Sequence, residues 1–266
     1  ILCQNNKVVI PSSIILNNRE YIITDIMENA MKSNKKVQVV EFYDDIPLTT
    51  FRKNLFSEYV KSIIIPKNIV ELEEGWCKSA IRLNKVLISP NNKYFGYIDE
   101  DHNLIGRKSD SSSTDYDILE FACRNIDRAI IPSTIKHISS FSFSECQLLE
   151  TVKFSEDSQL ISIGKGAFSF CFCLHQFYFP ANLKYLHHKK KNFPNITTVK
   201  ISPKNDHFGF LDDEHQLIGY KSDPRQESYD TIVFACRNIE KAVIPSNIKK
   251  IASNSFSFCH QLKSIE

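Results

Sequence analysis

Glycine is scarce in this sequence, with seven residues among 266. That is well below the roughly 7% that is usual in proteins, and phosphate-binding loops depend on glycine. The one close pair is Gly164 and Gly166, and neither a GKS/T nor a GxGxxG motif is present. The composition therefore argues against a nucleotide-binding enzyme.

Long apolar runs and an excess of one charge are also missing. No apolar stretch approaches the roughly 18–20 residues that span a bilayer, so we expect no membrane span in this segment. Lys and Arg number 33 against 31 Asp and Glu, a net charge of +2, so no basic field favours nucleic acid as a partner. The chain begins at Ile1 without a basic-then-apolar leader, and we expect it to be a piece of a longer chain.

What the sequence does contain is a composition typical of a folded protein and an internal duplication. Hydrophobic residues make up 42%, charged residues 24% and aromatic residues 11%. A shift of 113 residues aligns 88–153 with 201–266 without a gap, with about 35 of 66 positions identical. The motif FACRNI occurs in both copies.

A shorter period lies inside the long one. Apolar residues recur at fixed offsets after Pro66, Pro132 and Pro245, in the pattern I-P-x-x-I-x-x-I-x-x-x-x-F-x-x-C-x-x-L-x-x-V-x-F. The unit is about 22–25 residues long, within the leucine-rich-repeat range. Residues 1–60 keep the pattern poorly and read as degenerate N-terminal repeats.

The spacing predicts the course of each coil. The L-x-x-V-x-F part has the period of a short strand, and the I-x-x-I-x-x-x-x-F-x-x-C part has a spacing closer to a helical or 3₁₀ return. One coil cannot bury its apolar side alone, so neighbouring coils must stack. We therefore expect an α/β solenoid with one short parallel strand per coil, forming a single domain over residues 1–266.

This pattern resembles the BspA-like leucine-rich repeats, known from bacterial surface proteins and from surface-antigen-like proteins of flagellate protists. The resemblance implies a non-enzymatic adhesion or host-interaction protein, often exposed at the cell surface. Two interruptions, 90–125 and 203–238, depart from the simplest pattern. Each has an aromatic run, an acidic turn and an N/Q-L-I-G segment, which predicts an inserted β-hairpin projecting from the solenoid edge.

The residues that could form disulfides, bind a metal ion or bind an acidic partner are better explained by the repeat. Cys146, Cys171 and Cys259 occupy one repeat position and predict buried structural thiols without disulfides. The acidic tips 99–101 and 212–214 lack a calcium-loop register and read as polar turns. The basic run 187–191 reads as a solvated face on the convex side.

No catalytic, cofactor or metal site emerges from the sequence. The duplicated His102/Cys123 and His215/Cys236 could be imagined as Cys–His couples, but a copied pair fits a structural unit better than an active site. We expect no enzyme activity and no cofactor.

Solenoids usually bind through the outward side chains of their strands, which form a ladder on the concave face. Exposed apolar and aromatic residues beside cations are typical of protein interfaces, although β-propensity alone also places Ile, Val and Tyr on strands. The expected binding residues are Leu87, Arg128, Ile130, Thr151, Lys153, Gln176, Tyr178, Thr198, Lys200 and Lys241.

Two functions remain open at this stage. One is a protein-binding or adhesion module, such as a surface antigen that binds a host or cell-surface protein. The other is an intracellular scaffold or regulatory segment attached to another domain. The sequence names neither the partner nor the compartment.

Overall fold

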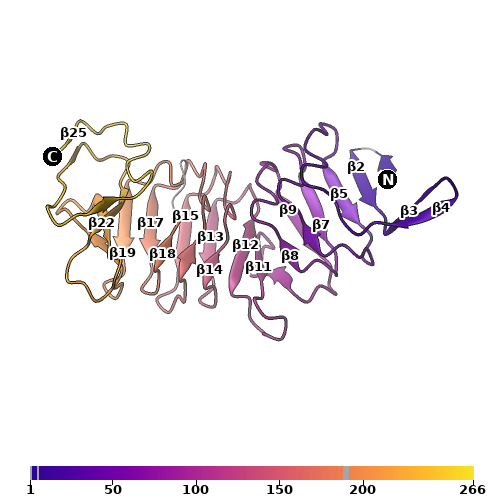
Figure 1. Cartoon of the computed structure of the whole chain (residues 1–266), viewed down its shortest axis with the longest axis horizontal. Helices are drawn as coiled ribbons and strands as arrows, with labels where there is room; N and C mark the ends of the chain where they lie inside the picture. The colour runs from indigo at the N-terminus through magenta and orange to yellow at the C-terminus, as the bar shows by residue number, and fades with distance from the viewer. Residues whose placement is uncertain (1, 5, 188–191) are drawn as a thin grey trace. The chain divides into compact units, whose positions relative to one another are not determined.

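The computed structural model describes residues 2–4, 6–187 and 192–266. The chain forms two compact units, which are described separately: unit 1 comprises 1–125 and 140–142, and unit 2 comprises 126–139 and 143–266 (Figure 1). Both units are stretches of β-solenoid, in which short strands of successive coils stack on one another.

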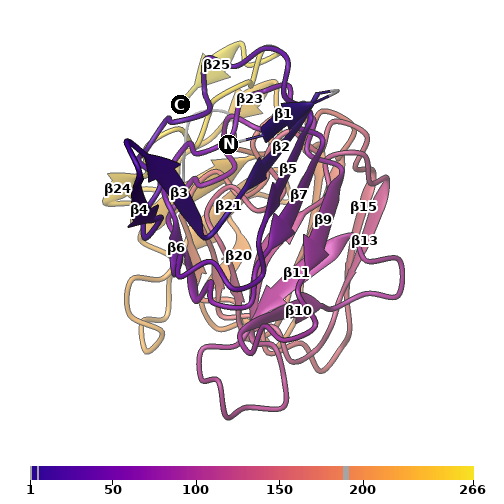
Figure 2. The same cartoon turned by 90° about the vertical axis from the view of Figure 1, so that its right-hand side faces the viewer.

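Unit 1 is built on a five-stranded sheet. The strands, in sheet order, are β1 (Leu2–Gln4), β2 (Lys7–Ile10), β5 (Val39–Phe42), β7 (Ser62–Ile65) and β9 (Lys85–Ile88). All neighbouring pairs from β2 to β9 are parallel, and these strands run side by side in Figure 2. Two short strands on the return side, β6 (Thr50–Phe51) and β8 (Glu71–Leu72), also pair in parallel.

Unit 2 repeats this arrangement. Its coil strands are β13 (Arg128–Ile131), β15 (Thr151–Phe154), β17 (Gln176–Phe179) and β19 (Thr198–Ile201). Its return strands are β14 (His137–Ile138), β16 (Ser162–Ile163) and β18 (Tyr185–Leu186). The last coils carry β22 (Thr231–Ala235) with β24 (Lys250–Ile251), and β23 (Lys241–Ala242) with β25 (Ser264–Ile265).

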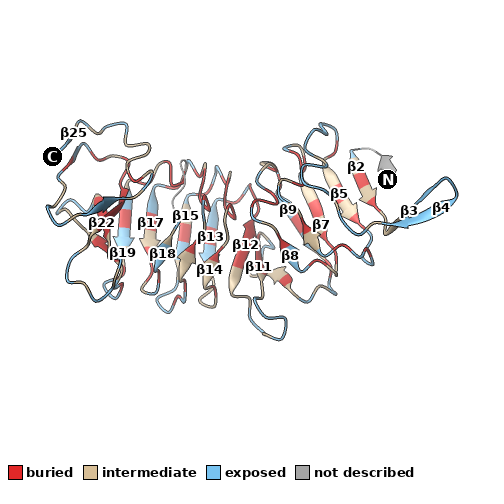
Figure 3. Ribbon diagram, viewed as in Figure 1, coloured by how far each residue is buried: buried red, intermediate tan, exposed pale blue. Residues whose placement is uncertain are grey.

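Alternation along the strands builds the core. In β13 the burial runs exposed, buried, exposed, buried, so Ala129 and Ile131 point inward (Figure 3). Stacked coils then join their inward side chains, as where Phe168 stacks on Phe143 with ring centroids 4.9 Å apart. Each coil therefore depends on its neighbour for a dry interior.

The expected helical return, and with it the α/β label, is wrong: the described residues contain no helix. The coil between β14 and β15 instead uses tight turns, with the Cys146 N–H donating to Phe143 O at 3.0 Å. Phe141 and Glu145 have φ angles of 65° and 68°. A helix cannot propagate through residues in the left-handed region, so the return is broken into single turns.

Each interruption folds as an antiparallel pair that stays joined to a sheet. In unit 1, β10 (Phe95–Tyr97) pairs with β11 (Leu104–Arg107), and β11 pairs in turn with β12 (Ile118–Ala122). In unit 2, β20 (Phe208–Phe210) and β21 (Leu217–Tyr220) pair likewise, and β21 pairs with β22. Both pairs therefore extend a sheet instead of standing alone at its edge.

The N-terminal region departs from the regular period. Partners in β5 and β7 are 23 residues apart (39 and 62), whereas partners in β2 and β5 are 32 apart (7 and 39), because the hairpin of β3 (Ser13–Leu16) and β4 (Arg19–Ile22) intervenes. The weakly patterned segment 44–60 nevertheless supplies fully buried side chains, including Phe51 and Phe56.

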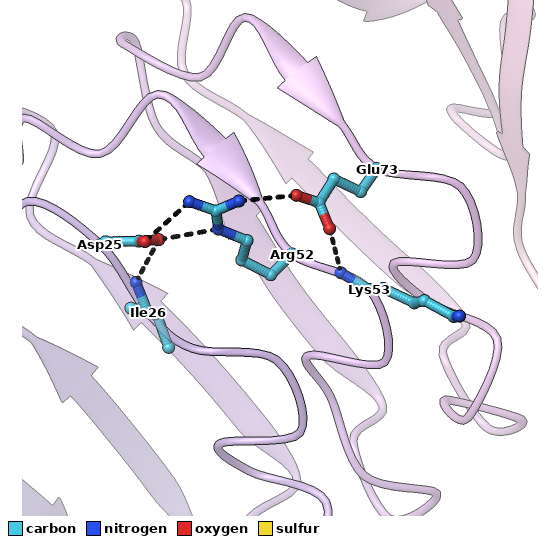
Figure 4. Close-up of polar contacts among 5 residues, drawn as sticks. All are labelled: Asp25, Ile26, Arg52, Lys53 and Glu73. Atoms are coloured by element: carbon cyan, nitrogen blue, oxygen red, sulfur yellow. Dashed lines mark hydrogen bonds and ion pairs between the residues drawn. The ribbon is translucent and has the colours of Figure 1, made fainter.

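An ion network joins three segments of unit 1 on its surface. The Arg52 guanidinium donates to Asp25 at 2.8 Å and to Glu73 at 2.9 Å, and Glu73 also accepts the Lys53 N–H (Figure 4). The guanidinium lowers the pKa of the Asp25 carboxyl, chiefly through this hydrogen bond. These side chains are well exposed, so the network orients the coils more than it stabilises them.

Candidate functional site

The expected binding residues of unit 2 share one face. The register pairs Arg128 with Thr151 and Ile130 with Lys153, and it pairs Gln176 with Thr198 and Tyr178 with Lys200. β15 and β17 lie next to each other, so the two pairs of strands follow in one series (Figure 1). We call the outward side of β13, β15, β17 and β19 the strand face.

The strand face is solvent-exposed because the inward alternate positions are committed to the core. Phe177 and Val199 are buried, and Phe177 packs edge-on against Phe154 of β15 with ring centroids 5.7 Å apart. On the outward side Ile130 is 64% exposed, Lys153 and Lys200 are exposed, and Tyr178 is half-buried. Tyr178 thus lies opposite Lys200 of β19, and β15, which carries Lys153, is the neighbour of β17 on its other side.

The strand face is cationic. Arg128, Lys153 and Lys200 lie on it, and within the described ranges no carboxylate comes within ion-pair distance of any of the three. Their charges are therefore available to an acidic group on a partner. An aromatic ring between two unpaired lysines offers apolar area together with charge-assisted hydrogen bonds.

Two expected residues belong to strands other than these four. Leu87 belongs to β9 of unit 1, where it is 40% exposed and paired in register with Ile64. Lys241 lies on β23, which pairs with β25, and its ammonium contacts Glu266 at 2.8 Å.

The repeat-position cysteines differ from one another in burial. Cys146 and Cys171 are buried, as the repeat predicts, whereas Cys259 is only half-buried. The Cys171 thiol contacts Phe143 O at 3.1 Å, which places it against the turn of the preceding coil. These small side chains occupy the same repeat position in their coils.

The geometry of Cys236 and His215 does not make a nucleophile and base. The Cys236 thiol faces the backbone carbonyl of His215 at 3.9 Å, while the His215 ring stacks on Phe210 with centroids 4.1 Å apart. Burial raises the pKa of Cys236 to about 12, which opposes formation of a thiolate.

Aspartates at the hairpin tips accept hydrogen bonds from N–H groups of their own turns. The Asp212 carboxylate accepts the N–H groups of Gln216 and Leu217 at 3.0 and 2.7 Å, and Asp99 accepts those of Asn103 and Leu104 in the same way. Over residues 2–4, 6–187 and 192–266, no three or more His, Cys, Asp or Glu side chains gather as metal ligands would. The tips are thus polar turns with capped N–H groups.

Most of the expected convex basic run lies outside the described residues. Of 187–191 the structure describes His187 alone, which is exposed. In the part of the chain that is described, no helix has the length and apolar character to cross a bilayer.

The structure also assigns a role to residues that the sequence analysis did not single out. Arg124 and Arg237, one in each copy of FACRNI, are buried, and each binds main-chain carbonyls. One sequence signal could have identified them: each is an arginine that follows an apolar strand motif, and it occurs in both copies of the duplication. Their role in binding carbonyls of neighbouring turns is structural.

Three bacterial proteins of known structure are similar to this chain. A leucine-rich repeat protein from Eubacterium ventriosum is 18% identical, with a TM-score of 0.59 over 91% of this chain and 69% of that one. The pneumococcal vaccine antigen PcpA is 15% identical, with a TM-score of 0.49 over 97% and 54% of the two chains. A leucine rich cell surface protein from Faecalibacterium prausnitzii is 14% identical, with a TM-score of 0.42 over 99% and 88%.

No curated protein matches the sequence. The family model described as a BspA type Leucine rich repeat region matches six copies, over residues 4–98, 118–210 and 225–266. These ranges include nearly every coil described above. The chain belongs to the BspA-type leucine-rich repeat family.

Proposed function

We propose that this chain is a protein-binding module that captures an acidic segment of a partner on the strand face. The observation that carries this proposal is the row of Ile130, Lys153, Tyr178 and Lys200, exposed or half-exposed on four successive strands. The cations have no ion partner within the described ranges, so an acidic partner would not have to displace one.

The row matches the residue types that anchor protein interfaces. Tyrosine supplies a large contact area at a low cost in side-chain entropy, and arginine and lysine supply charge for recognition. Leu87 of β9 and Lys241 of β23 stay proposed contact residues, each considered within its own unit. It does not require a cofactor or a reaction.

We further propose that the chain acts at a cell surface, as adhesion proteins of the family do. The support is family membership over most of the chain. Antibody labelling of intact cells that make the protein should then equal labelling of permeabilised cells. Labelling only after permeabilisation would favour the intracellular scaffold instead.

The binding experiment compares Tyr178→Ala with Tyr43→Ala. Both tyrosines are accessible, and Tyr43, which is 51% exposed in unit 1, belongs to none of the four strands of the strand face. Purified cell-surface and matrix proteins are passed over the immobilised chain, and the Kd of each binder is measured by surface plasmon resonance. Tyr178→Ala should cost about 1–3 kcal/mol of binding free energy, as interface anchors do, and Tyr43→Ala should cost little.

A second part of the binding experiment reverses the charge of two lysines. Lys153→Glu with Lys200→Glu should abolish binding, whereas Lys249→Glu with Lys250→Glu, the same change on and beside β24, should not. If substitutions at the tips 99–101 or 212–214 weaken binding more than those on the strand face, the wrong surface has been chosen.

A further inference from the structure

Unit 2 contains a second candidate site on its return side, between β18 and the hairpin of β20 and β21. It is a hollow of about 190 Å³, walled by Tyr185, Leu186, Phe208, Tyr220 and Val233. We call these five residues the aromatic pocket. Its size is that of one large side chain, since a dry cavity of roughly 150 Å³ holds benzene.

The duplication shows that this pocket is not a requirement of the fold. Tyr220 and Val233 correspond, 113 residues earlier, to Arg107 and Glu120. In unit 1 those residues form an ion pair at 2.6 Å, with the Glu120 side chain 6% exposed. The same two strand positions thus hold a polar pair in one copy and an apolar wall in the other.

The wall of the pocket is suited to an aromatic ring. Tyr220 packs on Phe208 with ring centroids 5.2 Å apart, and burial together with the nearby Tyr185 raises the pKa of the Tyr220 hydroxyl. Tyr185 itself is 53% exposed at the mouth. A third ring entering beside Tyr185 and Tyr220 would find the edge-to-face arrangements that aromatic side chains prefer.

An open strand edge runs along the pocket. Tyr185 and His187 donate their N–H groups to Ile161 and Ile163 of the preceding coil, at 3.1 and 3.0 Å. Main-chain groups alternate sides along a strand, so those of Leu186 point the other way. Among the described strands only β16 pairs with β18, so the Leu186 side of this edge can accept another strand.

The mouth of the pocket carries a cation. Lys184 lines it and is exposed, and the described lining residues include no Asp or Glu, although the Asp230 carboxylate is near enough to the Tyr220 hydroxyl to raise its pKa. A ligand with a carboxylate next to its apolar group would therefore be complementary. This charge, the open edge and the aromatic wall select the same kind of occupant.

We infer that the aromatic pocket binds an extended segment of a partner protein, which adds as a strand to the edge of β18 and inserts one aromatic side chain flanked by acidic residues. This site lies on the return side, apart from the strand face, and would serve as a second contact with the same partner or another one. Main-chain hydrogen bonds would supply affinity, and the pocket would supply the preference for the ring.

The test uses a labelled synthetic peptide, acetyl-Asp-Val-Phe-Val-Asp-amide, and measures its binding to the whole chain by fluorescence anisotropy. The same peptide with alanine in place of phenylalanine should bind at least tenfold more weakly. Heteronuclear NMR should show the largest shifts at Leu186 and around Tyr220. Failure of the phenylalanine peptide to bind, or equal binding of the two peptides, would overturn the inference.

The equivalent positions in unit 1 suggest a variant that should remove the aromatic pocket without unfolding the chain. Tyr220→Arg with Val233→Glu imports the ion pair that unit 1 already accommodates, so the variant should fold while losing at least tenfold in peptide affinity. Tyr185→Ser, at an exposed position, provides a second variant with little risk to folding. Lys35→Glu with Lys36→Glu, at exposed positions that belong to neither proposed site, should leave peptide binding unchanged. If both pocket variants bind the peptide as tightly as the parent chain, the inference is wrong.

Discussion

At the scale of single residues, buried arginines hold the turns of neighbouring coils. Arg237 is 7% exposed, and its guanidinium donates to the carbonyls of Phe193, Ala235 and Ser255, each at 3.0 Å. It also lies over the Phe234 ring, 4.2 Å from its centroid. Main-chain carbonyl oxygens of neighbouring turns thus accept the hydrogen bonds of this cation in place of a carboxylate.

Replacing this cation should be costly. Arg237→Met keeps much of the apolar volume but removes the charge-assisted hydrogen bonds to the carbonyls of Phe193, Ala235 and Ser255, so the free energy of unfolding should fall by roughly 3 kcal/mol. Urea unfolding followed by circular dichroism measures this loss. Lys249→Met, at an exposed position, is the matched control and should change stability by less than about 0.5 kcal/mol. Equal effects of the two substitutions would contradict the role given to Arg237.

The Cys236 thiol should make stability depend on alkaline pH. Burial raises its pKa in the folded chain to about 12, whereas an unfolded cysteine titrates near about 8.5. The protonated thiol therefore favours the folded state fully below about pH 8.5, and this advantage is lost as pH rises toward 12. The loss should approach about 1.4 kcal/mol per pH unit in that window.

The comparison with Cys236→Ala isolates this effect, because all other titrating groups are common to the two chains. Unfolding free energies measured between pH 8 and 11 should fall more steeply for the parent chain than for the variant. Parallel curves would show that the thiol is not desolvated in the folded state.

At the scale of single elements, the inserted hairpins depend on close backbone approach. A Cβ added at Gly209 of β20 would lie 1.9 Å from the Tyr229 hydroxyl and 2.3 Å from its ring carbon Cζ. Gly96 of β10 meets Tyr116 in the same way, at 1.9 Å. The tyrosine after each hairpin therefore lies directly over a glycine, and the pair has been kept in both copies.

Gly209→Ala should be destabilising despite the small size of the added methyl group. Overpacking of this kind costs about 1–3 kcal/mol, because either the ring or the strand must move. Thermal unfolding of four chains completes a double-mutant cycle: the parent, Gly209→Ala, Tyr229→Ala and the double variant. The alanine at 209 should cost little once Tyr229 is removed, and a cost that persists in the double variant would place the strain elsewhere.

At the scale of the whole molecule, the value of a core residue depends on whether a neighbouring coil covers it. Phe143 is fully buried under Phe168 of the next coil, whereas Phe172 in a later turn of the same unit is 42% exposed. A phenylalanine that a neighbouring coil covers thus contributes more than one that faces solvent.

This difference predicts unequal effects of one substitution. Phe143→Ala should destabilise unit 2 by about 3–5 kcal/mol, as expected for a buried aromatic side chain. Phe172→Ala should cost about 1–2 kcal/mol, since part of its surface is already in water. Chemical unfolding of both variants under the same conditions tests this, and a larger loss for Phe172→Ala would contradict the stacking argument.

Particular residues show how far the sequence could be used for prediction. The period of the repeat correctly separated inward Val152 and Phe177 from outward Lys153 and Tyr178, because alternation is a local property of an extended backbone. The family, and with it the stacking of coils, followed from the same spacing. The binding role of the outward residues remains a prediction.

Other features needed the folded chain. Helix-like spacing between Ile138 and Phe143 could not reveal that Phe141 adopts a positive φ and breaks the return into turns. The substitution of Tyr220 and Val233 for Arg107 and Glu120 was visible in the alignment, yet only the structure shows that it leaves an aromatic hollow beside the open edge of β18.

The sequence by itself thus determined the repeat, the buried positions and the sign of charge on the strand face, all of which follow from the alternation of side chains over a few residues. The tertiary structure decided where the ladder of strands is interrupted, which carbonyls Arg124 and Arg237 bind, and where an edge stays unpaired. These features depend on contacts between residues about 20 or more positions apart, and such contacts exist only once the coils have stacked.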